Sequence, residues 1–343
     1  MLTRVKHAGQ VACCGLLLLV GCGVTACTSE PDTAPPTIAP AEPAVSPPVT
    51  RRPAGVVRPM PGRAQSVVFD AATASLAALS PDKSGHAVVT VLPAKGVGRV
   101  IPLPAASTAM TGDNNGHLYV STRGGYFAVD LGQDRVSRVP VDRQDGTDFT
   151  AIARRADGKL VLGSTDGAVY TLTSDTAVEA ELKIFARVDA LVTQGNTAVV
   201  LDRGQTSVTT VDASGTKAAQ SLRAGEGATT MATDPAGRVL VVDTRGDGLL
   251  VFGIDPLILR QRYPVRDAPY GLTGSSRLAW VSQTTTNTVI GYDLATGIPV
   301  EKVRYPTVQQ PNSLAFDEAS DTLYVVSGVG AGVQVIAHAG GGR

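Results

Sequence analysis

The sequence repeats itself seven times, and this repetition limits the possible folds more than any other feature. Each repeat has a short apolar stretch, a turn with Asp, Asn or Gly, and a stretch rich in Val and Leu, as in TTMATDPAGRVLVVD. The second stretches align on Leu76, Leu118, Leu160, Ala198, Val239, Leu278 and Leu323. Their spacing of 38 to 45 residues indicates an array of equal structural units.

Each unit contains further strand-like stretches. A third one follows every pair, as in YFAVDL and TVIGYDL, and a fourth follows six of the seven, as in EKVRYPT. Short stretches bounded by Gly, Asp, Asn or Pro predict strands, and four strands at a period near 40 residues match a propeller blade. We therefore predict an all-β fold, a seven-bladed β-propeller of four-stranded antiparallel blades. Residues 176–192 have a helix-like composition, but the register of the repeat predicts strands there.

The seventh unit lacks its fourth strand, and this absence predicts how the ring closes. The unit ends at VIAHAGGGR, whereas the apolar piece AGVVRPMP (54–61) precedes the first unit. We expect Val56 and Val57 to pair with the last blade, because closure removes a sheet edge that would otherwise aggregate. Closure through packing alone is the alternative.

The first 26 residues are typical of an export signal. A basic start with Arg4 and Lys6 precedes an apolar run and small residues, and this run is diluted by Gly and Cys. A permanent span needs about 20 apolar residues, so we favour a signal segment over a retained anchor helix. All four cysteines lie at positions 13, 14, 22 and 27, so the folded body has none.

Two stretches, LVGC (19–22) and VTAC (24–27), resemble the bacterial lipobox. The resemblance implies that a cysteine carries a diacylglycerol, that a peptidase cuts before it, and that the lipid holds the protein on the outer face of the membrane. We favour Cys27 over Cys22, because anchoring at Cys22 would leave Cys27 as a spare thiol in an oxidising compartment.

The expected organisation has four parts: a lipoprotein signal peptide (1–26), a proline-rich disordered tether (27–53), the propeller (54–338) and a flexible tail (339–343). The tether lacks apolar periodicity and cannot bury enough surface to fold. Cleavage before Cys27 leaves 28 basic and 30 acidic residues. This balance argues against nucleic acid as a partner, because such a partner needs a basic surface.

The repeats also resemble a known group of propellers. HLYVST (117–122), GRVLVVDT (237–244), TVIGYDLATG (288–297) and DTLYVVSG (321–328) are similar to YVTN, NHL and YncE-like repeats, over about 64–337. With the lipobox, the whole chain resembles mycobacterial lipoproteins of the Lpp class. The resemblance implies the fold and the lipid anchor, but it indicates little about the function of the protein.

Candidate binding residues lie in the loops at one end of the blades. Arg123, Arg203 and Arg245 follow the second strand of three units, and Arg266 and Tyr270 lie on a loop between blades. Several guanidinium groups at one mouth of the channel predict binding of a carboxylate or phosphate. The alternative is that these arginines are solvated turn residues.

Acidic and amide side chains at strand starts are weak candidates for a metal site. Asp148, Asp189 and Asn312 could supply oxygen ligands to a divalent ion, although turn hydrogen bonds explain them more simply. His86, His117 and His338 stand alone, and Trp280 is interpreted as packing. We expect no cofactor and assign no catalytic residue.

The function that fits these features is binding. We expect a monomeric, lipid-anchored module on the outer face of the cell membrane that binds an envelope protein or a cell-wall ligand and contacts the membrane through its lipid. Rigid sheets that carry variable loops suit this role. The alternatives are a metal-dependent hydrolase or lyase of the propeller type and a purely structural envelope protein.

Overall fold

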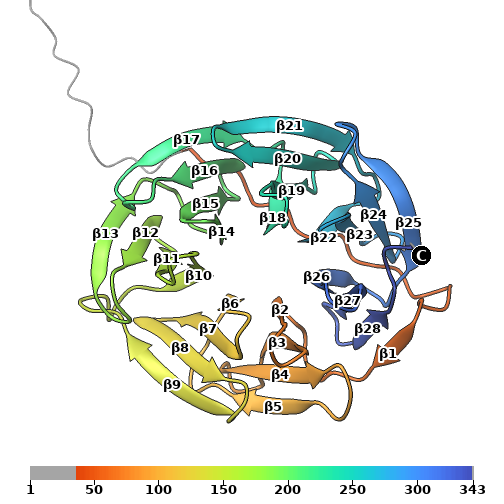
Figure 1. The fold of residues 1–343 in the computed structure, drawn as a ribbon, viewed down its shortest axis with the longest axis horizontal. Coiled ribbons are helices and arrows are strands. Elements are labelled where there is room, and N and C mark those ends of the chain that lie inside the picture. Colours follow the sequence, from red (N-terminus) through yellow and green to blue (C-terminus); the bar gives the residue numbers. More distant parts are fainter. Residues whose placement is uncertain (1–35, 342–343) are drawn as a thin grey trace, which may run out of the picture. The chain divides into compact units, whose positions relative to one another are not determined.

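The computed structural model describes residues 36–341 and shows a closed ring of seven four-stranded antiparallel sheets (Figure 1). Within these residues the regular structure consists of strands, without helices, so the predicted all-β propeller is confirmed. This part of the chain accordingly contains no helix that could span a membrane. The predicted signal peptide (1–26) and all four cysteines lie outside the described residues.

The blades follow the order of the chain, and the strands of each blade run from the central channel outward. Blade 1 comprises β2 (Ser66–Asp70), β3 (Ser75–Pro81), β4 (Ala87–Pro93) and β5 (Arg99–Pro102). Blade 2 comprises β6 (Met110–Gly112), β7 (His117–Thr122), β8 (Gly125–Asp130) and β9 (Arg135–Pro140). Blade 3 comprises β10 (Phe149–Arg154), β11 (Leu160–Ser164), β12 (Ala168–Leu172) and β13 (Val178–Lys183).

Blades 4 to 6 repeat this arrangement, and the segment 176–192 contributes strands to blades 3 and 4, as predicted. Blade 4 comprises β14 (Ala190–Gln194), β15 (Thr197–Asp202), β16 (Ser207–Val211) and β17 (Ala218–Arg223). Blade 5 comprises β18 (Ala228–Thr233), β19 (Val239–Asp243), β20 (Gly248–Ile254) and β21 (Leu257–Pro264). Blade 6 comprises β22 (Pro269–Gly274), β23 (Ala279–Gln283), β24 (Thr288–Asp293) and β25 (Val300–Pro306).

Blade 7 contains both ends of the propeller. It consists of β26 (Pro311–Asp317), β27 (Thr322–Ser327), β28 (Val333–Ile336) and β1 (Val56–Arg58). In this sheet Val56 pairs with Val335 and Val57 with Gln334. The predicted closure by Val56 and Val57 is confirmed.

Burial explains why the middle strands are Val-rich and the outer strands polar. Every residue of β11, β12 and β19 is buried, because both faces of these strands pack against neighbouring blades. The outer strand β17 is exposed along almost its whole length. Seven apolar clusters fill the spaces between successive blades, including the space between blades 7 and 1. The buried Trp280 stacks on Phe316 in one of them, which confirms its packing role.

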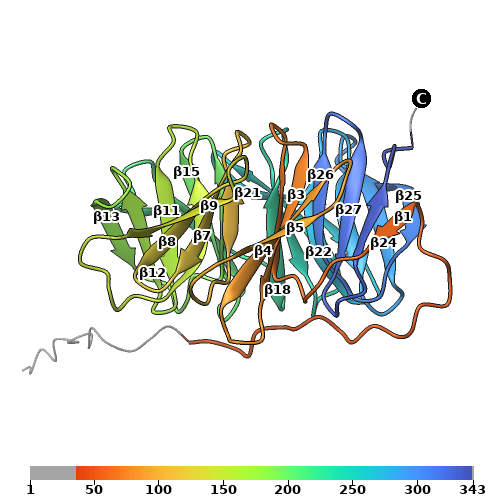
Figure 2. The ribbon, with the colours of Figure 1, turned by 90° about the horizontal axis from the view of Figure 1, so that it is seen from below.

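The two ends of the body differ from expectation. Residues 339–341, which we expected in a flexible tail, pack on the propeller: Ala339 is fully buried and its amide donates to the Asp321 carbonyl at 2.8 Å. Residues 36–53, called the N-terminal segment below, form no strand, in keeping with their composition. They are nevertheless docked rather than free, and Figure 2 shows them running along one face of the ring to β1.

Candidate functional site: the central channel and its covered mouth

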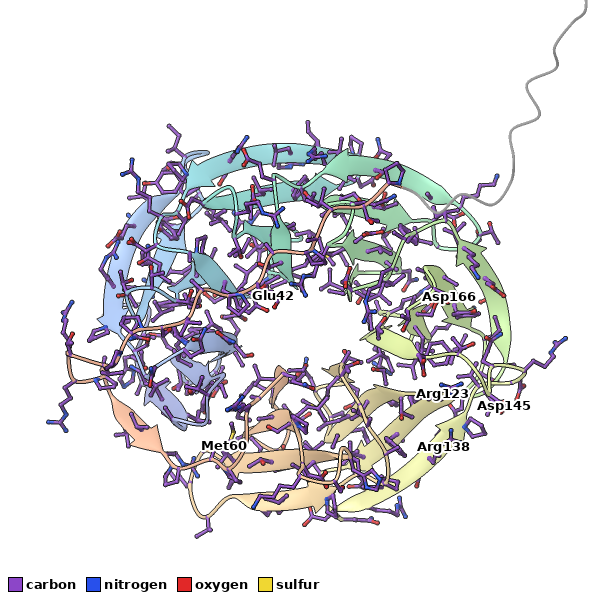
Figure 3. The ribbon with its side chains drawn as sticks, turned by 180° about the vertical axis from the view of Figure 1, so that it is seen from behind. Glu42, Met60, Arg123, Arg138, Asp145 and Asp166 are labelled. Atoms are coloured by element: carbon purple, nitrogen blue, oxygen red, sulfur yellow. The ribbon has the colours of Figure 1, made fainter. Side chains whose placement is uncertain are left out.

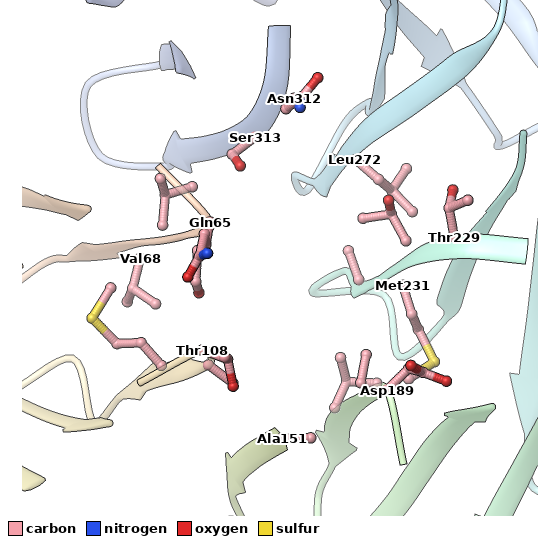
Figure 4. Close-up of a pocket in the computed structure, with 18 of the residues that line it drawn as sticks. Gln65, Val68, Thr108, Ala151, Asp189, Thr229, Met231, Leu272, Asn312 and Ser313 are labelled. Carbon is pink, nitrogen blue, oxygen red and sulfur yellow. The ribbon is translucent and has the colours of Figure 1, made fainter. Parts of the chain in front are cut away.

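The central channel is a cavity of about 1000 Å³ lined by the innermost strands of all seven blades (Figure 4). Eight of its lining residues are threonines, and many of the others are aliphatic residues from the same strands, such as Ala151, Leu191 and Val192. Among the described lining residues, only Glu42, Arg63 and Asp189 carry charge. The channel therefore offers hydroxyl groups and apolar surface to a ligand, with little net charge.

One mouth of the channel collects the loops singled out from the sequence. Ala190 at the start of β14 pairs with Leu201 near the end of β15, so inner-strand starts and second-to-third strand loops meet at the same end. Glu42 and Pro43 of the N-terminal segment also line the channel, and Figure 3 shows Glu42 beside the central opening. We call this end the covered mouth.

Asp189 is the buried acid of the covered mouth. One carboxylate oxygen accepts a hydrogen bond from the Arg203 amide at 2.8 Å, and the other lies 3.1 Å from Nε of Arg187. Burial nevertheless raises the pKa of Asp189, because desolvation of the carboxylate outweighs these favourable contacts. Its oxygens already have partners within the protein.

The N-terminal segment occupies two of the predicted ligand-binding arginines. Nη2 of Arg203 donates to the Ala41 carbonyl and lies 3.1 Å from Oε1 of Glu42. Nη2 of Arg245 donates to the Ala39 carbonyl at 2.8 Å. Both guanidinium groups therefore bind carbonyl groups of the chain's own backbone. Arg203 is largely buried, whereas Arg245 stays exposed to solvent.

The other predicted ligand-binding residues are dispersed. Tyr270 lines the channel, and burial raises the pKa of its phenol. Arg123 lies away from the opening (Figure 3), with Nη1 3.4 Å from Asp148. Arg266 is exposed beside blade 6 and lies outside the channel lining. The structure thus brings Tyr270 to the channel and Arg203 and Arg245 to the N-terminal segment, and it does not gather the five predicted residues around one site.

The three weak metal candidates do not form one cluster. Asp189 and Asn312 line the channel, whereas Asp148 pairs with Arg123 outside it. Within residues 36–341 no group of three or more His, Cys, Asp or Glu side chains is close enough to hold a metal ion.

Sequence reasoning missed the polar residues that contact the segment from blades 6 and 7. Asn287, Gln309 and Gln310 all donate to backbone carbonyls of residues 44–47. No motif marks these side chains, because their ligands are carbonyl groups that every residue carries.

Comparisons with known proteins support the fold alone. No protein-family model matches the chain, and no curated protein matched it. Among solved structures it resembles a streptogramin B lyase, with a TM-score of 0.61 and 10% identity over 79% of this chain and 95% of that chain. A virginiamycin B lyase from Staphylococcus aureus gives 0.62 and 11%, covering 78% and 92%. Kuenenia stuttgartiensis hydrazine synthase gives 0.64 and 16%, covering 82% and 97%.

Proposed function

We propose that this protein is a lipid-anchored, extracytoplasmic propeller that acts as a binding or scaffold module for an envelope protein or a cell-wall ligand. The lipobox-like stretches before Cys22 and Cys27 support the anchor. A proline-rich segment between the anchor and the propeller would act as a spacer. The propeller itself has no cysteine, so it would be stable outside the cell without disulfides.

The channel is the observation that carries the binding role. It has the size of a small-molecule site, and its polar groups are mostly threonine hydroxyls rather than charges. Hydroxyl groups donate to and accept from neutral ligands. A hydroxyl-bearing or amide-bearing fragment of the cell wall fits this lining better than a phosphate or a strongly charged ligand.

The test is co-sedimentation of the full chain with isolated cell-wall material. Thr230 lies in the channel lining, and Thr230→Trp places a large side chain there. We expect this variant to reduce the bound fraction at least tenfold. The matched control is Thr296→Trp, on an exposed turn between β24 and β25. Equal binding by both variants, or none by the wild type, would exclude the channel as a cell-wall site.

A further inference from the structure

We propose that the covered mouth is a peptide-binding groove, and that an extended, proline-rich segment of a partner protein can replace the chain's own N-terminal segment there. The groove is defined by the side chains of Arg203, Arg245, Asn287, Gln309 and Gln310. This inference goes beyond the proposed function, which concerns the channel and a cell-wall ligand.

The groove recognises the backbone of an extended chain. Four of its side chains, which come from blades 4 to 7, donate to carbonyls distributed over residues 39–47 of the segment. The contacts are Arg245 to Ala39 at 2.8 Å, Arg203 to Ala41, Gln309 to Ser46 at 3.1 Å and Asn287 to Pro47 at 2.8 Å. Carbonyl groups occur in every peptide, so these contacts select an extended conformation rather than one sequence.

Gln310 is the centre of this recognition. Its Oε1 accepts from the Ser46 amide at 2.9 Å, while its Nε2 donates to the Ala44 carbonyl at 3.0 Å. The side-chain amide therefore pairs with the segment as a neighbouring strand would. Gln310 is only 5% exposed, and Asn312 accepts from its Nε2 at 2.9 Å while Asn287 accepts from its backbone amide at 3.1 Å. These hydrogen bonds fix the orientation of the Gln310 side-chain amide toward the peptide.

Gln310 also has a backbone φ of 56°, in the left-handed region. For a residue other than glycine such a conformation is strained, and it is found at ligand clamps. The Gln310 carbonyl, which accepts from the amides of Asn312 and Gly328 at 2.8 Å each, maintains this conformation.

Two closed positions in the groove restrict the side chains of its ligand. Ala41 and Ser46 are 7% and 4% exposed, whereas Val45 between them is 89% exposed. A Cβ built on Gly227 would lie 3.0 Å from the Ala41 Cβ, so the backbone closes directly over this methyl group. The fitting ligand has small residues five positions apart and is kept extended by proline.

The segment is positioned to exchange with such a ligand. None of residues 36–53 belongs to the seven apolar clusters, so its release leaves the packing between blades in place. Its attachment to the propeller gives it an effective concentration in the millimolar range, and a free peptide must compete with this. Release would also remove Glu42 and Pro43 from the channel mouth.

The test uses the full chain and a fluorescent peptide with the sequence of residues 36–50, PTIAPAEPAVSPPVT. Ser46→Arg and Ala41→Glu each place a side chain that the groove cannot accept into the chain's own segment. Fluorescence anisotropy should show that both variants bind the peptide at least tenfold more tightly than the wild type. Val45→Arg adds the same charge at an exposed position and should bind like the wild type.

Adding Gln310→Ala to Ser46→Arg should weaken peptide binding at least tenfold. Equal affinity of Ser46→Arg, Ala41→Glu and Val45→Arg, or binding insensitive to Gln310→Ala, would overturn the proposal. So would loss of cooperative melting in both Ser46→Arg and Ala41→Glu, since the segment would then be part of the folded core. Because the assay contains no cell-wall material, its failure leaves the channel proposal to its own test.

Discussion

The side-chain amide of Gln310 and the backbone amide of Ser46 form a hydrogen bond of 2.9 Å across 264 positions of the chain. This bond fixes the middle of the N-terminal segment against blade 7. The segment also forms hydrogen bonds with the carbonyls of Gly204 and Thr284 and with the side chains of Arg203, Arg245, Asn287 and Gln309. A stretch that composition predicts to be free is in this way held on the propeller.

Removal of the Gln310 amide should loosen the segment. Gln310→Ala deprives the Ser46 amide and the Ala44 carbonyl of their partner, and each buried polar group left alone costs about 1–3 kcal/mol. Hydrogen-exchange mass spectrometry should show at least tenfold faster exchange of residues 38–46. Gln133→Ala, at an exposed position, serves as the control and should leave this exchange unchanged.

Ring closure should be sensitive to one glycine. Gly55 has a φ of +69°, and a Cβ there would lie 2.1 Å from the Val335 carbonyl oxygen, so Gly55→Ala must displace β1 from β28. We expect a loss of about 3 kcal/mol or more in the free energy of unfolding, measured with denaturant.

Gly85→Ala separates the clash from backbone strain. Gly85 has a similar φ of +87°, but a Cβ there would meet nothing within 4 Å, so only strain of about 1 kcal/mol is expected. Equal losses for the two variants would show that the β1–β28 pairing adds nothing to stability.

Asp189 and Asp166 should affect the pH dependence of stability in opposite directions. Burial raises the pKa of Asp189 above its ordinary value of 3.8, so its contribution is most favourable at low pH and declines as pH rises through the raised pKa. Denaturation from pH 3 to 7 should therefore show the wild type losing stability relative to Asp189→Asn as pH increases.

Asp166 provides the matched comparison. Hydrogen bonds from Lys183 at 2.7 Å and Ser164 at 2.6 Å lower its pKa below 3.8. Its stabilising contribution is present above that value and is lost as pH falls through the lowered pKa. The wild type should therefore lose stability relative to Asp166→Asn on acidification, by less than about 1 kcal/mol because the pair is exposed. The same sign of change for both variants would contradict the assignment.

The anchor should depend on one cysteine. We expect Cys27→Ser to abolish incorporation of a fatty-acid analogue and to shift the protein from the membrane fraction to the soluble fraction, with Cys22→Ser retaining both. The reverse result would place the lipid on Cys22. Retention of label in the double variant would exclude both lipobox-like stretches.

The blades could be predicted because the sequence pattern that specifies each strand is local and is repeated seven times. Alternating Val and Leu stretches, separated by Asp, Asn and Gly turns, specify a strand within a few residues, and seven copies reinforce one another. The missing fourth strand of the last unit made the pairing of Val56 and Val57 with the last blade predictable as well. Place at a strand start did not decide which side chains reach the channel, because Asp189 and Asn312 line it whereas Asp148 pairs with Arg123 outside it.

The sequence by itself therefore determined the propeller, its closure and its channel, because apolar periodicity and turn chemistry act over short distances along the chain. Only the tertiary structure decided that Arg203 and Arg245 bind residues 39–42, and that Gln310 binds residues 44–46. The physical reason is that nearly all of these contacts go to backbone amides and carbonyls, which every residue has, across separations of more than 160 positions. A pattern of side chains in the sequence does not predict such a contact, because the two partners come together only when the ring has formed.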